Sequence, residues 1–111
     1  MDPIRMAFVE GVLKKMQEAI RDGQYDVDDR GKNLYTLSML GYTWKDALEC
    51  VNELTVNEYF QGPNGDRDHP DTDPYWVFKK IIEGQMVYIK IKVRILQDGK
   101  LYLKSFHFDG E

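Results

Sequence analysis

The run Met86–Leu96 constrains the fold more than any other part of the chain, because its polarity alternates strictly. One set of alternate residues is aliphatic: Val87, Ile89, Ile91, Val93 and Ile95. The other set is polar: Tyr88, Lys90, Lys92 and Arg94. Successive side chains of a β-strand point to opposite faces of a sheet. The run therefore predicts a strand with one core face and one wet face.

Asp98-Gly99, just after this run, has the composition of a two-residue hairpin turn. A hairpin centred there pairs Lys90 with His107 and Lys92 with Ser105 on the polar face. The same register places two apolar pairs on the other face: Ile91 with Phe106, and Ile89 with Phe108. A slip of one residue mixes the two faces, so the pattern supports this choice of face.

Glu83-Gly84 predicts an earlier hairpin in the same sheet. In that register Lys79 pairs with Tyr88, and Tyr75 pairs with Lys92, again on the polar face. The apolar pairs are Trp76 with Ile91 and Phe78 with Ile89. Two independent turns thus agree on which side of the sheet is the core.

The first half of the chain has helical spacing. Asp2-Pro3 is a favourable helix start, and Gly23 can end that helix in the left-handed conformation. The residues expected to face the core are Ile4, Phe8, Val12, Leu13, Met16, Ala19 and Ile20. Residues 24–27 form a short extended piece in this interpretation.

Three more helical segments follow in the predicted order. They are residues 32–40, a helix capped by Thr43, and a short turn that runs from Thr55 to about Phe60. Their expected core residues are Leu34, Leu37, Leu40, Ala47, Leu48 and Val51. Gln61–Pro74 is rich in turn formers and is expected to hold no regular element. The sequence thus predicts one α+β domain over residues 1–111, with helices on one face of a three- or four-stranded antiparallel sheet.

The net charge of −4 is unevenly distributed. Residues 1–74 hold 8 Lys and Arg against 15 Asp and Glu, whereas residues 75–111 hold 7 against 4. A basic C-terminal third favours a local anion-binding face, although a merely solvated sheet surface fits the charge pattern equally well. The single cysteine, Cys50, and the absence of a signal-like or membrane-length apolar run lead us to expect a cytoplasmic protein with no membrane partner.

The polar face of the predicted sheet collects residues that are able to handle protons and bind phosphate. They are Tyr75, Lys79, Tyr88, Lys90, Lys92, Arg94, Ser105 and His107. Metal-free RNA cleavage needs a base for the 2′-hydroxyl, an acid for the leaving 5′-oxygen, and cations for the phosphorane. Tyr88 and His107 suit the proton transfers and the lysines suit the phosphate, and crowded lysines lower one another's pKa. Strand lysines are more often only a solvated face, so these residues alone do not establish catalysis.

The stretch Leu54–His107 resembles the MqsR family of toxins, which are mRNA interferases with a RelE-like fold. The resemblance rests on several short motifs: Leu-Thr-Val-Asn-Glu-Tyr from Leu54, Gly62-Pro63, Asp66-Arg67-Asp68, Trp76-Val77-Phe78-Lys79, Gly84, Val87-Tyr88-Ile89-Lys90-Ile91-Lys92 and Ser105-Phe106-His107. The helical first half fits the family in order and length. The resemblance implies a metal- and cofactor-independent endoribonuclease that acts on mRNA and leaves a 2′,3′-cyclic phosphate and a 5′-hydroxyl. It also implies a cognate antitoxin as a protein partner.

By position, the resemblance implies that Tyr88 is the family's sheet tyrosine and that His107 takes the place of its C-terminal basic residue. Two positions depart from the family: Gln61 stands where a lysine is expected, and Val77 where a glutamine is expected. Lys79 and Arg67 are the candidate replacements. The predicted catalytic residues are therefore Tyr88, His107, Lys79 and Lys90. The predicted substrate-binding residues are Lys92, Arg94, Arg67, Gln61, Tyr75 and Ser105. A non-catalytic module of the same fold, which binds RNA or protein, remains the alternative.

Overall fold

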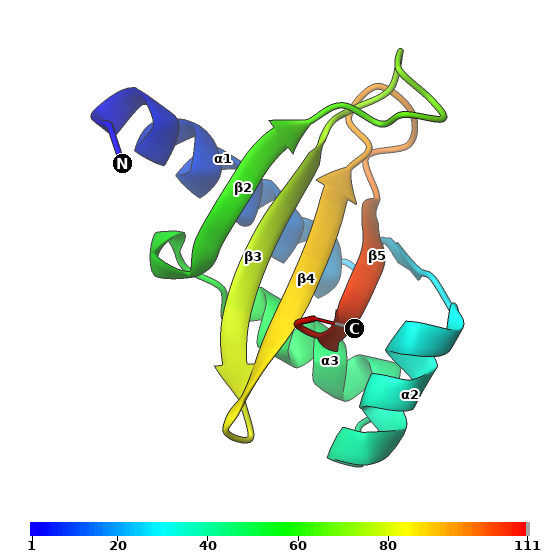
Figure 1. Cartoon of the computed structure of the whole chain (residues 1–111). Coiled ribbons are helices and arrows are strands. Elements are labelled where there is room, and N and C mark those ends of the chain that lie inside the picture. The colour runs from blue at the N-terminus through cyan, green and yellow to red at the C-terminus, as the bar shows by residue number, and fades with distance from the viewer. Residues whose placement is uncertain (111) are drawn as a thin grey trace.

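The computed structural model describes residues 1–110 as an α+β fold in which helices pack on a five-stranded mixed sheet. The strand order is β1-β5-β4-β3-β2. Helices α1 and α3 lie behind one face of the sheet, and α2 lies beside the β5 edge (Figure 1). The opposite face of the sheet carries no helix in this view. One hydrophobic cluster between the sheet and the helices forms the core.

Helix α1 (Pro3–Arg21) begins where Asp2 accepts a hydrogen bond from the backbone N–H of Arg5 at 2.8 Å, as the sequence predicts. Its buried residues are Val9, Leu13, Met16 and Ala19. The expectation that Ile4 and Phe8 face the core is wrong, because they are 73% and 64% exposed. The stripe that contacts the sheet begins at Val9, and the first turns of the helix project past it (Figure 1).

Helix α2 (Gly31–Leu40) ends at Gly41, whose φ of 71° is left-handed, and α3 (Trp44–Asn52) begins with the expected capping box between Thr43 and Asp46. Leu37, Ala47, Leu48 and Val51 are buried, which confirms these core predictions. Leu34 is exposed instead, and Leu40 is half-buried. The buried face of α2 is polar and consists of Asn33 and Thr36 together with Leu37.

The segment after α3 differs from the expectation. A second capping box, Thr55 with Glu58, starts only a short 3₁₀ turn, Val56–Glu58, and strand β2 (Tyr59–Asn64) follows at once. This strand was missed because it lies at the sheet edge and its pairing with β3 shifts register twice. Glycine is required at 62, since φ is 135° and an added Cβ meets Trp76 atoms at 3.0 and 3.1 Å.

Strands β3 (Tyr75–Ile82) and β4 (Gln85–Val93) pair as predicted around Glu83-Gly84, where both residues have positive φ. Trp76 pairs with Ile91, and Lys79 pairs with Tyr88. The short piece near residue 25 is confirmed as β1 (Tyr25–Val27), and it pairs with β5 (Leu101–Phe108) in parallel rather than antiparallel fashion.

The predicted β4–β5 register is wrong by two residues from Val87 to Lys90 and by three from Ile91 to Val93. His107 pairs with Tyr88 rather than Lys90, and Ser105 pairs with Lys90 rather than Lys92. The connection is a loop over residues 94–100, not a two-residue turn, and the ladder shifts register between Lys90 and Ile91. Two is an even number, so His107 and Ser105 stay on the face predicted for them. Beyond the shift the error is odd, and Leu101 and Leu103 lie on the core face with Val93 and Ile91.

Candidate functional site

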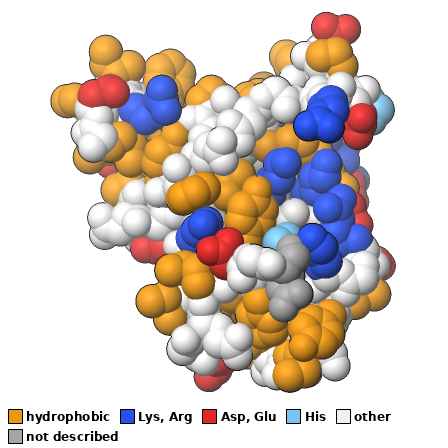
Figure 2. All heavy atoms as spheres, in the orientation of Figure 1, with side chains coloured by type: hydrophobic (Ala, Val, Ile, Leu, Met, Phe, Trp, Pro, Cys, Tyr) orange, Lys and Arg blue, Asp and Glu red, His pale blue; other side chains and the backbone are white. Residues whose placement is uncertain are grey.

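The open face of the sheet carries the polar residues of β3, β4 and β5. Figure 2 shows Lys and Arg side chains gathered on this face over the β4 and β5 region, with a histidine at the lower end of the group. The face therefore has the basic character that the alternating pattern predicts.

Tyr88 and His107 are direct cross-strand partners at the centre of this face. Their rings are stacked, with centroids 5.2 Å apart and an interplanar angle of 17°. The His107 Nδ1–H donates to the backbone carbonyl oxygen of Phe108 at 3.0 Å, since that oxygen can only accept. In the neutral imidazole the lone pair then lies on Nε2, the nitrogen that is able to accept a proton.

Lys79, Tyr88 and His107 form one row across strands β3, β4 and β5, because Lys79 pairs with Tyr88 on its other side. Its ammonium contacts the Asp109 carboxylate at 3.0 Å and lies 3.9 Å from the centroid of the Phe60 ring. Lys79 is thus brought beside the Tyr88–His107 pair as predicted, but Asp109 balances its charge.

Lys90 occupies the next row of the same face, between Val77 on β3 and Ser105 on β5. Its pKa is lowered, first by burial and then by the positive charges of Lys104 and Arg30. The sequence led us to expect a lysine with a lowered pKa from crowding, and the structure adds burial as the larger cause. Gln61 pairs with Val77 on the far side, so Gln61 and Ser105 both lie on this row.

Helix α2 determines the position of β5 by completing the hydrogen bonds of its edge. Asn33 is fully buried; its Nδ2 donates to the carbonyl oxygen of Lys104 at 3.0 Å, and its Oδ1 accepts from Phe106 N–H at 2.9 Å. One turn later the Thr36 hydroxyl oxygen accepts from Phe108 N–H at 3.1 Å. These side chains bind the edge of β5 beyond Leu103, where its pairing with β1 ends, and they hold the backbone on both sides of His107.

Tyr75 lies beneath three ammonium groups. The Nζ atoms of Lys90, Lys92 and Lys104 lie 4.8, 4.5 and 4.9 Å from its ring centroid. Tyr75 is only 4% exposed, and burial raises its pKa. Tyr75 was predicted to bind substrate from this face, but its side chain is buried beneath the lysines and is not open to a ligand.

Lys92 also differs from its predicted place, since it is 4% exposed. Its ammonium contacts the Asp66 carboxylate at 2.7 Å and the Thr72 hydroxyl oxygen at 2.9 Å. Asp66 further accepts the backbone N–H groups of Asp68 and His69, and its pKa falls to about 2, chiefly because of the Lys92 hydrogen bond. Lys92 thus holds the 65–74 loop on the sheet and is not open to a ligand.

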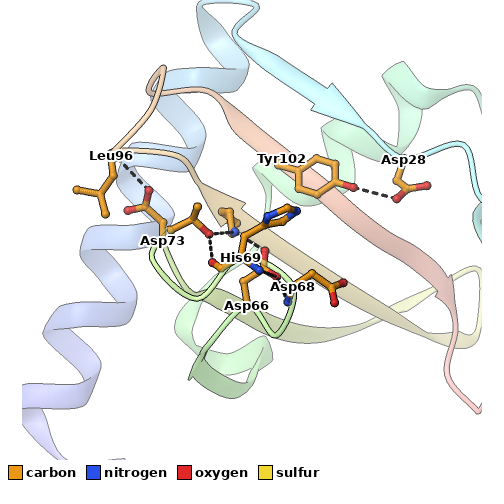
Figure 3. A network of polar contacts seen from close by, with 9 residues as sticks. Asp28, Asp66, Asp68, His69, Asp73, Leu96 and Tyr102 are labelled. Atoms are coloured by element: carbon orange, nitrogen blue, oxygen red, sulfur yellow. Dashed lines mark hydrogen bonds and ion pairs between the residues drawn. The ribbon is translucent and has the colours of Figure 1, made fainter.

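A second contact fixes the same loop. Asp73 accepts the backbone N–H of Leu96 at 2.9 Å and so ties the 65–74 loop to the 94–100 loop (Figure 3). Arg94, at the end of β4, forms ion pairs with Asp26 and Asp98. The prediction of Arg94 as a free phosphate contact is therefore not supported by its surroundings, whereas Arg67 is exposed in the loop and its charge acts on Lys90.

Three functional candidates were missed in the sequence. Lys104 lies on β5 beside the register shift, where the alternation of side chains no longer predicts which face of the sheet a residue lies on. Arg30 precedes α2 and reaches the face only through the fold, and Tyr102 is held by Asp28 through a 2.9 Å hydrogen bond. No local sequence signal marks Arg30, whereas Lys104 was visible as a lysine in a predicted strand.

Within residues 1–110, no three His, Cys, Asp or Glu side chains gather into a metal-binding group. No helix in that range is long and apolar enough to cross a membrane. Comparison of the chain with known protein families and with curated proteins finds no match to either.

Proposed function

We propose that this chain is a metal-independent endoribonuclease, the toxin of a toxin–antitoxin pair, with the RelE-like fold of the MqsR family that its sequence resembles. The observation that carries the proposal is the stacked Tyr88–His107 pair, with the lone pair on His107 Nε2, beside the lysines of the adjacent row. Such a site holds a proton acceptor, a proton donor and phosphate-binding cations on one face. In this proposal mRNA is the substrate and an antitoxin protein is the partner.

The proposed reaction uses these groups in one displacement. His107 Nε2 removes the proton of the ribose 2′-hydroxyl, and the 2′-oxygen forms a bond to the adjacent phosphorus. The bond from phosphorus to the 5′-oxygen breaks, and the Tyr88 hydroxyl donates the proton that this oxygen gains. Lys79, the β3 partner of Tyr88, stabilises the added negative charge of the phosphorane. The products are a 2′,3′-cyclic phosphate and a 5′-hydroxyl. Water then carries the extra proton from His107 to Tyr88, which restores both groups.

The second candidate is a module of the same fold that binds RNA or a protein without cutting. Two observations favour it: His107 is only 9% exposed, and Val77, where the family has a glutamine, is fully buried. A buried imidazole has less access to a ribose hydroxyl than an open one. The two candidates differ in whether bound RNA is cleaved.

The test is cleavage of a 5′-labelled single-stranded RNA by the purified chain in the presence of EDTA, with and without ribosomes. We expect His107→Ala to lower the rate by about 100- to 10,000-fold and Tyr88→Phe to lower it as well. His69→Ala is the matched control, because His69 is exposed and, within residues 1–110, its hydrogen bonds come from its backbone. A 2′-deoxy substitution at the cleaved nucleotide should stop the reaction.

The outcomes separate the candidates. Wild-type protein that binds RNA but leaves it intact under both conditions supports the binding module and excludes the nuclease. Equal cleavage by the His107→Ala and His69→Ala variants contradicts the assignment of His107 as the base. Induction in cells adds an independent measurement, since a toxin of this kind arrests growth and depletes mRNA.

A further inference from the structure

Two cations on the open face of the sheet form no ion pair in the described part of the chain. They are Lys90 and Lys104. Both ammonium groups lie within 5 Å of the Tyr75 ring centroid, so they are at most about 10 Å apart. Both side chains are half-buried, so water screens their repulsion incompletely. The carboxylate of Asp66, which pairs with Lys92, also acts on Lys90, but less strongly than Lys104 or Arg30 does. The remaining repulsion is unfavourable, and a bound anion reduces it.

Two arginines extend this positive region. Arg30 and Arg67 both act electrostatically on Lys90. Arg67 makes no ion pair among residues 1–110, and the partner of Arg30, Asp28, also accepts a hydrogen bond from Tyr102. Figure 2 shows the blue side chains of this region as a continuous group that begins near the exposed loop and ends near the histidine.

The backbone around Lys104 is rigidly held, which makes the group a built site rather than a chance meeting of long side chains. Asn33 binds the carbonyl oxygen of Lys104, and Ser105 next to it pairs with Lys90. Tyr75 fills the space beneath the ammonium groups. The positions of both amines therefore depend on buried contacts.

We propose that Lys90, Lys104 and Arg30 form a phosphodiester-binding subsite for single-stranded RNA, one nucleotide away from the cleaved linkage. The identity of the ligand as RNA rests on the proposed function, whereas the affinity for a phosphate group rests on the cation cluster itself. Lys90 lies two residues from Tyr88 on the same face of β4, a separation of about 7 Å. That separation allows two neighbouring phosphates of an extended RNA to lie at the row of Tyr88 and at the row of Lys90 at the same time.

The test measures binding of a 2′-O-methyl oligonucleotide, which cannot be cleaved by 2′-hydroxyl attack, as a function of salt concentration. We expect Lys104→Gln and Arg30→Gln each to weaken binding about 5- to 10-fold and to reduce the salt slope by about 0.7, the value for one phosphate contact on a single strand. Lys104→Arg should restore most of the affinity. Lys45→Gln, an exposed lysine on α3, is the matched control and should leave both quantities unchanged.

A single neutral methylphosphonate linkage, moved along the oligonucleotide, locates the contact. Wild-type affinity should drop when the neutral linkage lies next to the cleaved position, and Lys104→Gln should then cause no further loss. The second arm compares inorganic phosphate with the oligonucleotide as protectants of the Lys104 amine against chemical modification. Equal protection by the two indicates a free-phosphate site and overturns the RNA assignment.

Failure of this proposal is distinguishable from failure of the nuclease. If Lys104→Gln and Lys45→Gln bind equally well while the wild type cleaves RNA, the subsite is wrong and the nuclease stands. If Lys104→Gln causes no further loss of affinity once the linkage is neutral, but the wild type never cleaves, the subsite stands and the nuclease is wrong. Circular dichroism of each variant shows that the fold is retained.

Discussion

The two ends of strand β4 have the same alternating sequence and opposite electrostatic surroundings. At one end, Lys92 and Arg94 are matched by carboxylates from distant segments: Asp66, Asp26 and Asp98. Two residues toward the other end, Lys90 forms no ion pair within residues 1–110 and lies close to Lys104 instead. Four polar residues with the same spacing in the sequence thus divide into a structural half and a half available to a ligand.

The difference shows that a basic strand face becomes a binding site only where the fold leaves its charge unbalanced. The 65–74 loop brings Asp66 onto Lys92, so that end of the strand holds the loop in place. At the Tyr88 end the edge of β5 is completed by neutral groups of α2, Asn33 and Thr36. Neutral partners fix the backbone without cancelling the charge of the lysines.

The largest effect should follow from breaking the balanced end. Asp66→Ala leaves the Lys92 ammonium buried without a counter-ion, and we expect it to lower the free energy of unfolding by about 3–5 kcal/mol. Chemical denaturation measures this change. The double variant Asp66→Asn/Lys92→Met should recover most of the loss, because it removes both charges. A double variant as unstable as the single one contradicts the ion-pair explanation.

The next effect concerns the neutral support of the open end. Asn33→Ala leaves a buried N–H on β5 and a carbonyl oxygen of Lys104 without partners, and we expect a loss of about 2–3 kcal/mol in unfolding free energy. Asn57→Ala, an exposed position in the 3₁₀ turn, is the control and should change little. Hydrogen exchange at Phe106 N–H should accelerate in Asn33→Ala. Unchanged exchange at that amide argues against the role assigned to Asn33.

A third prediction uses acid to titrate the balanced end. The pKa of Asp66 is about 2 in the folded chain and 3.8 ordinarily, so its contribution is fully present above about pH 4 and is lost as the pH falls toward 2. Over that window the wild type should lose about 2 kcal/mol more stability than Asp66→Asn/Lys92→Met. Denaturation curves at several pH values measure the difference. Parallel curves for the two proteins contradict the assignment.

The smallest effect should come from the unbalanced end. Lys90→Met removes a charge that is repelled by Lys104 and Arg30, so stability should stay the same or rise by up to about 1 kcal/mol at low salt. Added salt should shrink this gain, because it screens the repulsion in the wild type. Lys92→Met, with the same chemistry two residues along β4, should be destabilising instead. Equal destabilisation by both substitutions removes the distinction between the two ends.

The accuracy of the sequence-based interpretation varies along the sheet for physical reasons. The β3–β4 register was predictable because Glu83-Gly84 forms a tight turn whose geometry depends on neighbouring residues alone. The β4–β5 register was not, because the 94–100 loop is held by Asp73, a residue more than twenty positions away. Strand β2 escaped because an irregular edge strand has no alternating pattern to detect.

Within the candidate site, the sequence was sufficient to place Tyr88, Lys90 and His107 on one face, since alternation in a strand is a local property of the backbone. It also determined the helix caps at Asp2, Thr43 and Thr55, because each cap needs only side chains within one turn. Only the tertiary structure decided that His107 stacks on Tyr88, that Lys104 joins Lys90, and that Lys92 is neutralised. Those outcomes depend on strand register and on carboxylates delivered from remote loops, and neither is encoded in the neighbouring residues.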